Sequence, residues 1–217
     1  MQNDFIIALA WPEGMVASTD VWYDKFFAKK GKYRVGHSAV VLVERLTGEL
    51  HYFDFGRYHT SKGFGRVRNK ETDHDVCIQI SAEIESSKIV NIKDILVEIK
   101  KNTAFHGEGT LYASILNDVS FNKAYEYAKK IQNKGLVLYG PFVYSGTNCS
   151  RFVASVMRSS SPTFIKNARL KLPFCISPSP KRNVGIANAN FYKVAGNLVK
   201  KVKRNIIESY FKSIERS

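Results

Sequence analysis

The sequence predicts an α+β protein in which an antiparallel sheet, or a small barrel, packs against a helix that begins at Cys149, with an amphipathic helix at the C-terminus. Three observations support this class. Short runs rich in β-branched and aromatic residues occupy 37–45 and 49–57, as in a β-hairpin. Later segments place apolar residues at helical spacing. The chain has 217 residues, of which 44% are hydrophobic, which suits a globular domain with its own core.

The N-terminal part of the chain is expected to supply most of the sheet. Residues 5–10 form a short apolar run that ends at Trp11-Pro12, as a buried strand does. Thr47-Gly48, between the two hairpin runs, is a turn signal. The remaining segments are predicted as a short helix over 21–29, an exposed basic loop over 62–70 and a further strand over 75–80.

The central part is expected to alternate helices with strands. The predicted helices cover 92–101, a segment that starts after Ser120 and stops before Gly135, and 149–158. Residues 111–116 are predicted as a strand, with a helical turn as the alternative, and 136–139 as a short strand.

The C-terminal part carries most of the positive charge. From Lys166 onward there are twelve Lys and Arg residues against two Glu residues, which accounts for +10 of the formal net charge of +14. Residues 159–188 are predicted to be irregular and to wrap the body, and 191–214 to form a long amphipathic helix. Such a helix either docks its apolar stripe on the body or lies on an anionic membrane.

The three cysteines, Cys77, Cys149 and Cys175, form no CxxC pair, so neither a disulfide framework nor a zinc knuckle is expected. Cys149 differs from the other two because Asn148 is a suitable N-cap and places Cys149 at the first position of a helix. The unpaired N–H groups and the dipole of a helix start favour a thiolate and can bind an oxyanion. The alternative is an ordinary buried thiol.

A candidate partner for Cys149 is His37, which follows Gly36 at the first position of a strong strand. From the end of a strand, an imidazole can reach the edge of the sheet and act as general base to a cysteine on a packed helix. A single histidine in this position would more often be structural, so the interpretation depends on the pair.

Asp54 is the candidate third residue because it is the only carboxylate in the aromatic run 52–55. If Thr47-Gly48 is a two-residue turn, Asp54 lies opposite Val41 and on the same face of the sheet as His37. A carboxylate placed there can orient the imidazole. The alternative is a partly solvated strand residue, and a different turn favours another partner: His51, Tyr58 or His59.

Two segments together resemble a known superfamily. Gly-His-Ser-Ala-Val-Val-Leu-Val at 36–43, followed by a hairpin, and Thr-Asn-Cys-Ser-Arg-Phe-Val at 147–153 are similar to the circularly permuted NlpC-like branch of the papain superfamily. That branch includes lecithin retinol acyltransferase-like enzymes and PPPDE isopeptidases, in which the histidine precedes the cysteine. The resemblance covers the hairpin and the cysteine helix, roughly 35 residues. The third position of that branch is often histidine or another polar side chain, and Asp54 is a departure at this position.

The resemblance implies a papain-like catalytic domain over 1–165, in which Cys149 is the nucleophile, His37 the base and Asp54 the third residue. It implies a cysteine-dependent hydrolase of amidase or peptidase type, or an acyltransferase, that acts on a peptide, amide or ester through a thioacyl-enzyme. Asn148 and Tyr144 are close enough in sequence to donate hydrogen bonds to substrate or oxyanion, although capping and packing roles are the alternatives. Residues 166–217 would then be a basic wrapping segment and helix on the same domain.

Other functions have weaker support in the sequence. His74 and Cys77 have the spacing of metal ligands but no second pair follows, and Gly63-x-Gly65 leads into no phosphate-binding helix, so neither a metal nor a cofactor is expected. The basic segments carry no recognisable nucleic-acid motif. The main alternative is a non-catalytic binding module that uses the basic C-terminal helix at an anionic membrane or another anionic partner. Because no signal-like or membrane-spanning stretch is present, we expect a cytoplasmic protein, with peripheral membrane contact as the variant.

Overall fold

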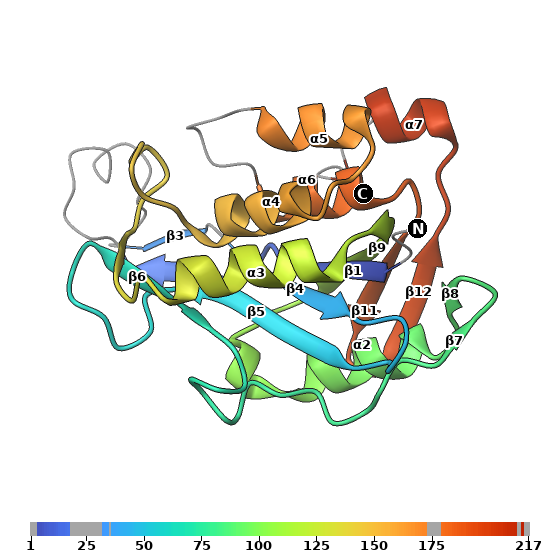
Figure 1. The fold of residues 1–217 in the computed structure, drawn as a ribbon, viewed down its shortest axis with the longest axis horizontal. Helices are drawn as coiled ribbons and strands as arrows, with labels where there is room; N and C mark the ends of the chain where they lie inside the picture. Colours follow the sequence, from blue (N-terminus) through green and yellow to red (C-terminus); the bar gives the residue numbers. More distant parts are fainter. Residues whose placement is uncertain (1–3, 18–31, 35, 173–178, 212–213, 215–217) are drawn as a thin grey trace.

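A computed structural model describes residues 4–17, 32–34, 36–172, 179–211 and 214. Its centre is an eight-stranded antiparallel sheet in the order β10-β6-β5-β4-β1-β9-β11-β12 (Figure 1). The strands of this sheet are β1 (Asp4–Trp11), β4 (His37–Val43), β5 (Leu50–Gly56), β6 (Phe64–Arg68), β9 (Leu111–Val119), β10 (Val137–Leu138), β11 (Phe191–Ala195) and β12 (Leu198–Val202). Two small ladders pair β2 (Met15–Ala17) with β3 (Lys32–Arg34) and β7 (Ile84–Glu85) with β8 (Lys88–Ile89).

Helices cover both faces of the sheet, which gives three layers (Figure 1). One face carries α3 (Phe121–Gln132), α4 (Cys149–Ser159), α5 (Phe164–Lys171) and α6 (Pro180–Ala187). The other face carries α2 (Ile92–Lys101) and the 3₁₀ turn η1 (Thr103–Phe105), and α7 (Ile206–Phe211) lies near the C-terminal end. The α+β class with a large antiparallel sheet is therefore confirmed.

The continuous apolar run of β1 follows from this layering. Ile6, Ala8 and Ala10 face the core beneath α3, α4 and α6, whereas Phe5, Ile7, Leu9 and Trp11 face the core beneath α2. Because side chains alternate along a strand, a strand covered on both faces needs apolar residues at every position.

The hairpin of β4 and β5 forms with a different register from the one expected. Asp54 lies opposite Ala39, not Val41. The reason is a longer turn: Glu44 pairs with Glu49 through a backbone hydrogen bond of 3.1 Å, so four residues (45–48) close the hairpin instead of two. Gly48 has φ 73°, a backbone conformation that favours glycine. The shift brings Asp54 nearer to the start of β4, where His37 lies.

Several predicted elements are confirmed. The helices predicted over 92–101, after Ser120 and over 149–158 correspond to α2, α3 and α4, and the strands predicted over 5–10, 111–116 and 136–139 correspond to β1, β9 and β10. The Ser120 hydroxyl accepts a hydrogen bond from the Lys123 amide and caps α3, as expected. The helix predicted over 21–29 lies outside the described residues.

Two predictions in the region after the hairpin are wrong. The segment 62–70 is not an exposed loop, because it contains β6, whose Val67 and Arg68 are buried. Residues 75–80 form no strand. Their apolar side chains pack on the core between the sheet and α2. The Glu98 carboxylate accepts hydrogen bonds from the Gln79 and Ile80 amides, which takes the place of a strand partner.

The C-terminal predictions are also wrong. The segment 159–188 is not irregular in its described part, because that part contains helices α5 and α6. The segment 191–214 is not one amphipathic helix: β11 and β12 form a hairpin closed at Gly196, which has φ 56°, and α7 follows. Phe191 and Val194 are fully buried and Leu198 is 73% exposed, so the expected apolar stripe does not exist.

The expected membrane contact depended on a long C-terminal helix, and the described part of 191–214 forms two strands and a short helix instead. Strand β11 pairs with β9 and extends the central sheet, so residues after 165 complete the same core. Within the described ranges, no helix combines the length and the apolar character needed to cross a bilayer.

Candidate active site

The three residues Cys149, His37 and Asp54 meet at one end of the sheet. His37 is the first residue of β4 and Cys149 is the first residue of α4. Gly36 precedes His37 with φ 65°, and a Cβ atom at this position would lie 2.6 Å from the Trp11 carbonyl oxygen. Only glycine fits this close approach, which brings the chain into β4 with the imidazole at the sheet edge.

The imidazole of His37 lies between the other two side chains. His37 Nε2 is 3.0 Å from Asp54 Oδ2. Cys149 lines the same cleft as this ring and is close enough to raise the pKa of His37. Because Nε2 is engaged by Asp54, Nδ1 is the ring nitrogen that remains for Cys149.

The contacts of His37 determine its protonation. Burial alone lowers the pKa of His37, but the hydrogen bonds and charges of Asp54 and Cys149 outweigh it and raise the pKa from 6.5 to about 9. Burial also opposes ionisation of Asp54, yet His37 and Arg68 together hold the pKa of its carboxyl well below the usual range. At neutral pH the pair is therefore an imidazolium beside a carboxylate.

A cleft of about 620 Å³ opens over this group. Cys149 is only 7% exposed and the His37 side chain only 12%, so both lie at the floor of the cleft. The walls carry both charged and polar groups. The lining residues are Gly14, Gly36, His37, Phe55, Gly56, Arg57, Tyr58, Thr60, Ser61, Lys62, His106, Glu108, Tyr139 and Cys149.

The helix start at Cys149 has the expected cap. The Asn148 side-chain oxygen accepts a hydrogen bond of 3.0 Å from the Arg151 amide, and Asn148 itself is extended. The cap fixes Cys149 at the point where backbone N–H groups of α4 lack helical partners. The expected N-cap role of Asn148 is thus confirmed, and its amide oxygen is engaged in it.

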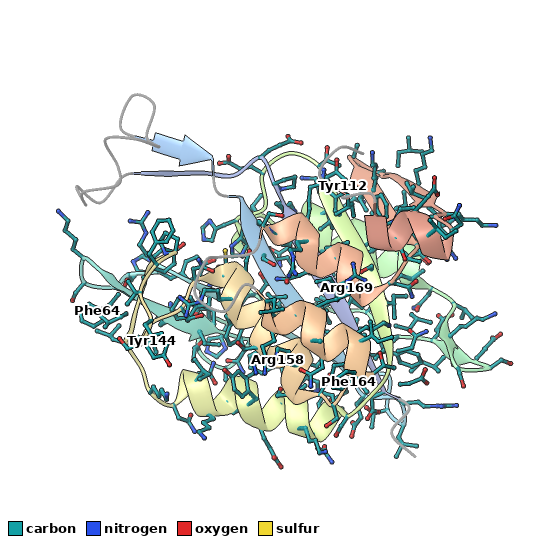
Figure 2. All side chains as sticks on the ribbon, turned by 90° about the horizontal axis from the view of Figure 1, so that it is seen from above. Phe64, Tyr112, Tyr144, Arg158, Phe164 and Arg169 are labelled. Atoms are coloured by element: carbon teal, nitrogen blue, oxygen red, sulfur yellow. The ribbon has the colours of Figure 1, made fainter. Side chains whose placement is uncertain are left out.

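Tyr144 lies apart from the other predicted site residues. It belongs to the loop between β10 and α4, its side chain is 75% exposed, and it is not among the residues that line the cleft (Figure 2). The geometry therefore brings together four of the five predicted residues and leaves Tyr144 outside.

The sequence model described as "Type VI secretion system effector TseH-like" matches residues 6–164, most of the chain. The chain belongs to the TseH-like effector family. The matched segment contains His37, Asp54 and Cys149 and ends at the first residue of α5. A search of curated protein sequences finds no match.

A solved structure agrees with the family assignment. The crystal structure of the Type VI secretion system effector TseH is similar to this TseH-like chain with a TM-score of 0.65 and 17% sequence identity, over 93% of this chain and 99% of that one. At this identity the similarity shows a shared fold. It covers a larger share of the chain than the family model does.

Several site residues were not expected from the sequence of this TseH-like protein. Trp11 stacks on the His37 ring with centroids 5.7 Å apart. Tyr52 and Tyr58 each donate a hydrogen bond of 2.9 Å to Asp54 Oδ2. Period-two alternation could have indicated Tyr52, which lies two residues before Asp54, whereas Tyr58 was considered only as a substitute for Asp54. Arg68 was missed because its segment looked like a basic loop.

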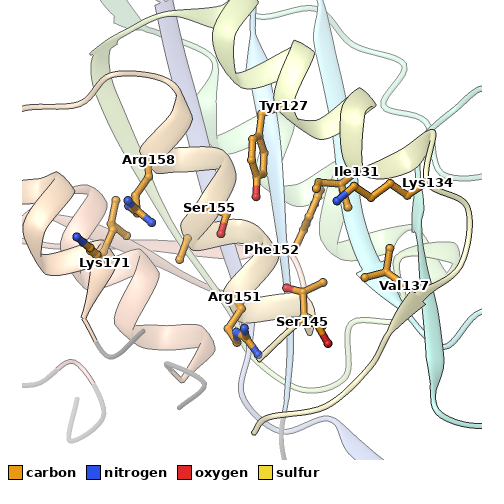
Figure 3. Close-up of a pocket in the computed structure, with 14 residues that line it drawn as sticks. Tyr127, Ile131, Lys134, Val137, Ser145, Arg151, Phe152, Ser155, Arg158 and Lys171 are labelled. Atoms are coloured by element: carbon orange, nitrogen blue, oxygen red, sulfur yellow. The ribbon is translucent and has the colours of Figure 1, made fainter. Parts of the chain in front are cut away.

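A second cavity of about 240 Å³ lies between α3, α4 and α5 and contains none of the residues of the cleft (Figure 3). Two of its cations already fasten neighbouring segments. Arg151 Nη1 donates to the Val143 carbonyl at 2.7 Å, and Arg158 Nε donates to Asn167 Oδ1 at 3.1 Å. This cavity therefore marks where the loop before α4 and helix α5 are attached to α4.

Among the residues that the structure describes, no three His, Cys, Asp or Glu side chains are grouped as metal ligands.

Proposed function

We propose that this TseH-like chain is a cysteine-dependent hydrolase of amidase or peptidase type. In this proposal Cys149 is the nucleophile, His37 is the general acid and base, and Asp54 orients the imidazole. The observation that carries the proposal is the His37 ring, which is hydrogen-bonded to Asp54 and lines the same cleft as Cys149. A structural histidine needs no such access to a pocket.

The order His37, Asp54, Cys149 along the chain supports the permuted papain-like arrangement to which the sequence was compared. In that reading the helix start supplies the thiolate site and the strand supplies the base, with roles defined by geometry and not by sequence order. The similarity in fold to the TseH effector is compatible with the permuted papain-like arrangement.

The proposed reaction begins from the Cys149 thiolate beside the His37 imidazolium. The sulfur attacks the carbonyl carbon of the substrate, a C–S bond forms, and the Cys149 backbone N–H at the start of α4 donates to the oxyanion. His37 then gives its proton to the leaving amine or alkoxide as the C–N or C–O bond breaks. Neutral His37 takes a proton from water, the hydroxide displaces the thiolate, and the acid product leaves.

The family description also suggests where such chemistry acts. Relatives are described as Type VI secretion system effectors, and we propose the same role for this chain. A secreted effector would leave the cell that makes it, whereas the sequence alone led us to expect a cytoplasmic protein. The substrate would contain a peptide, amide or ester carbonyl.

Reaction of the cysteines with iodoacetamide tests the proposal. We expect Cys149 to be alkylated at least about ten times faster than Cys77 at pH 7, because His37 beside it can act as its base, as in other cysteine nucleophiles. His37→Ala should remove this advantage. Peptide mapping by mass spectrometry measures each cysteine separately, so Cys77 and Cys175 serve as internal controls.

Two outcomes would count against the enzyme. If Cys149 reacts no faster than a free thiol, or if His37→Ala leaves its rate unchanged, a non-catalytic binding module becomes the better reading. If instead Cys149 shows the expected reactivity, the protein can be assayed with amide and ester substrates in the presence of hydroxylamine. Formation of a hydroxamate at the expense of the acid would identify acyl transfer in addition to hydrolysis.

A further inference from the structure

The surroundings of Asp54 are unusual for a strand residue. Its side chain has no exposed surface, and one of its oxygens, Oδ2, receives four donors. These donors are His37 Nε2 at 3.0 Å, Tyr52 OH at 2.9 Å, Tyr58 OH at 2.9 Å and Arg68 Nη2 at 2.7 Å. The second oxygen, Oδ1, receives Arg68 Nε at 3.1 Å.

Arg68 supplies the only side-on pair of hydrogen bonds in this group, one to each oxygen of Asp54. Its side chain is itself buried, with 4% exposed. A carboxylate buried without a cation takes up a proton in preference to staying charged. Arg68 is a permanent cation at physiological pH, so it keeps Asp54 charged whether or not His37 carries its second proton.

The charge of Asp54 matters for the direction of the imidazole. A carboxylate without a proton can only accept, so it requires the hydrogen on His37 Nε2 and leaves Nδ1 directed at Cys149. A protonated carboxyl could donate to Nε2 instead, which would move the ring hydrogen to Nδ1. That tautomer cannot take the proton of the Cys149 thiol.

Arg68 also supports the wall of the cleft. Its guanidinium carbon lies 3.5 Å from the centroid of the Tyr58 ring, which packs under it. The hydroxyl of the same ring donates to Asp54 and lies 3.4 Å from His37 Nε2. One side chain therefore fixes both the carboxylate and the tyrosine that contact the imidazole. A lysine would provide the charge but neither the side-on pair nor the flat surface.

We propose that Arg68 is a positioning residue of the active site, which keeps Asp54 a carboxylate and thereby fixes the His37 tautomer that activates Cys149. This inference rests on the proposed function. It adds Arg68, on strand β6, to the group formed by His37, Asp54 and Cys149. Arg68 is not itself among the residues that line the cleft, so it acts through Asp54 and Tyr58.

The test compares Arg68→Met and Arg68→Lys with the unmodified protein. The first readout is the rate of Cys149 alkylation by iodoacetamide between about pH 5 and pH 10. Loss of a buried cation favours proton uptake by every neighbouring group, so we expect the acid limb of the Arg68→Met profile to move up by about one pH unit or more. We expect Arg68→Lys to give a smaller shift, because it retains the charge.

The second readout needs no reactive cysteine. The ¹⁵N shifts of the His37 ring, assigned with His37→Gln, report which nitrogen holds the hydrogen at each pH. Below about pH 9 we expect hydrogen on both ring nitrogens in the unmodified protein, and in Arg68→Met a mixture of that form with one whose Nε2 hydrogen has passed to Asp54. Arg158→Met, which replaces an arginine bonded to Asn167 outside the cleft, is the matched control and should change neither readout.

The outcomes separate this inference from the proposed function. Cys149 reactivity that does not depend on His37 would overturn the proposed function, whatever Arg68 does. Arg68→Met or Arg68→Lys with unchanged alkylation profile and unchanged His37 ring shifts would overturn the role of Arg68 alone. Should Arg68→Met fail to fold by circular dichroism, Arg68→Lys decides: the expected intermediate shift supports the proposal and a profile that overlays the unmodified one refutes it.

Discussion

At the scale of single residues, contacts with several neighbouring side chains fix the orientation of the His37 ring. Asp54 engages Nε2, Trp11 stacks on the ring and Tyr58 meets it edge-on with centroids 6.4 Å apart. Rotation of the imidazole would break at least one of these contacts. Such rigid support is what an acid–base group needs in order to serve both the nucleophile and the leaving group.

Asp54→Asn tests the electrostatic part of this support. The amide keeps the shape of the side chain but removes the charge, while burial of His37 remains. Since Asp54 is a main cause of the raised pKa of His37, we expect the His37 titration to fall from about 9 to near or below 6.5. The alkylation rate of Cys149 at pH 7 should fall by about 100-fold or more, within the range of general acid–base effects.

The measurement is a ¹H–¹⁵N titration of the histidine rings. Glu49→Gln is the matched control, because Glu49 lies 3.2 Å from His51 Nε2 and should change the titration of that ring and not that of His37. A His37 midpoint that stays near 9 in Asp54→Asn would show that another group sets it.

At the scale of elements, helix α4 connects the core to the chemistry. Phe152, Val153, Val156 and Met157 are buried beneath it, and the Asn183 amide donates to the Ser150 carbonyl at 2.8 Å. The first turn is therefore fixed from below by packing and from the side by α6. Its N-terminal end, at Cys149, stays at the cleft.

The cap of α4 can be separated from its stability. We expect Asn148→Ala to lower the free energy of unfolding by about 1 kcal/mol, as the loss of an N-cap does. It should also lower the alkylation rate of Cys149, because the first turn frays. Ser120→Ala removes the equivalent cap of α3 and should cost a similar free energy without affecting Cys149.

Urea unfolding and alkylation kinetics of the two variants together decide the matter. Equal losses of reactivity in Asn148→Ala and Ser120→Ala would mean that global stability, and not the geometry of the α4 start, controls the thiol.

The sequence was most informative where local signals and tertiary contacts agree. The caps at Asn148 and Ser120 placed α4 and α3 correctly, and the apolar alternation of 37–57 placed the β4–β5 hairpin. The register could not be predicted, because it depends on a four-residue turn that Thr47-Gly48 alone does not specify. His37, Asp54 and Cys149 were nevertheless named correctly as neighbours, since the true register places Asp54 closer to His37.

Elsewhere, long-range pairing outweighed the local pattern. Apolar residues at 191, 194, 198 and 202 fit a helical period, yet β9 offers a free edge and β11 joins it. In the same way, the charges of 62–70 suggested solvent, although Arg68 is buried against Asp54. A buried ion pair leaves no signature in the local sequence because its two halves are separated along the chain.

At the scale of the whole molecule, the C-terminal hairpin is part of the same core. Phe191 is fully buried, its ring stacks on Tyr112 with centroids 6.2 Å apart, and Arg204 lies 5.3 Å from its centre. We expect Phe191→Ala to lower the free energy of unfolding by about 3–5 kcal/mol. Leu198→Ala, on the neighbouring strand but 73% exposed, should cost less than about 0.5 kcal/mol.

Urea denaturation of both variants measures the difference. A small effect of Phe191→Ala would mean that β11 and β12 are an appendage that unfolds separately from the sheet.

The pH dependence of stability links the active-site group to the whole fold. The pKa of His37 is raised from 6.5 to about 9, so the folded state gains stability from its protonation below pH 6.5 and loses that gain as the pH rises through 9. The pKa of Asp54 is lowered from 3.8, so its contribution is present above pH 3.8 and is lost as the pH falls further. The two groups together therefore stabilise the folded state most between pH 3.8 and pH 6.5, the ordinary pKa values of the two side chains.

Replacement of His37 isolates the loss of stability that is expected as the pH rises toward 9. We expect the stability advantage of the unmodified protein over His37→Gln to be largest near about pH 5.5 and to shrink steadily up to about pH 9.5. His51 is the opposite case, because burial lowers its pKa, and the protein should gain nothing from its protonation. His51→Gln should therefore show no decline in its difference from the unmodified protein between about pH 7 and pH 9.5. Parallel declines in the two variants would attribute the pH effect to the net charge of the chain and not to the His37–Asp54 pair.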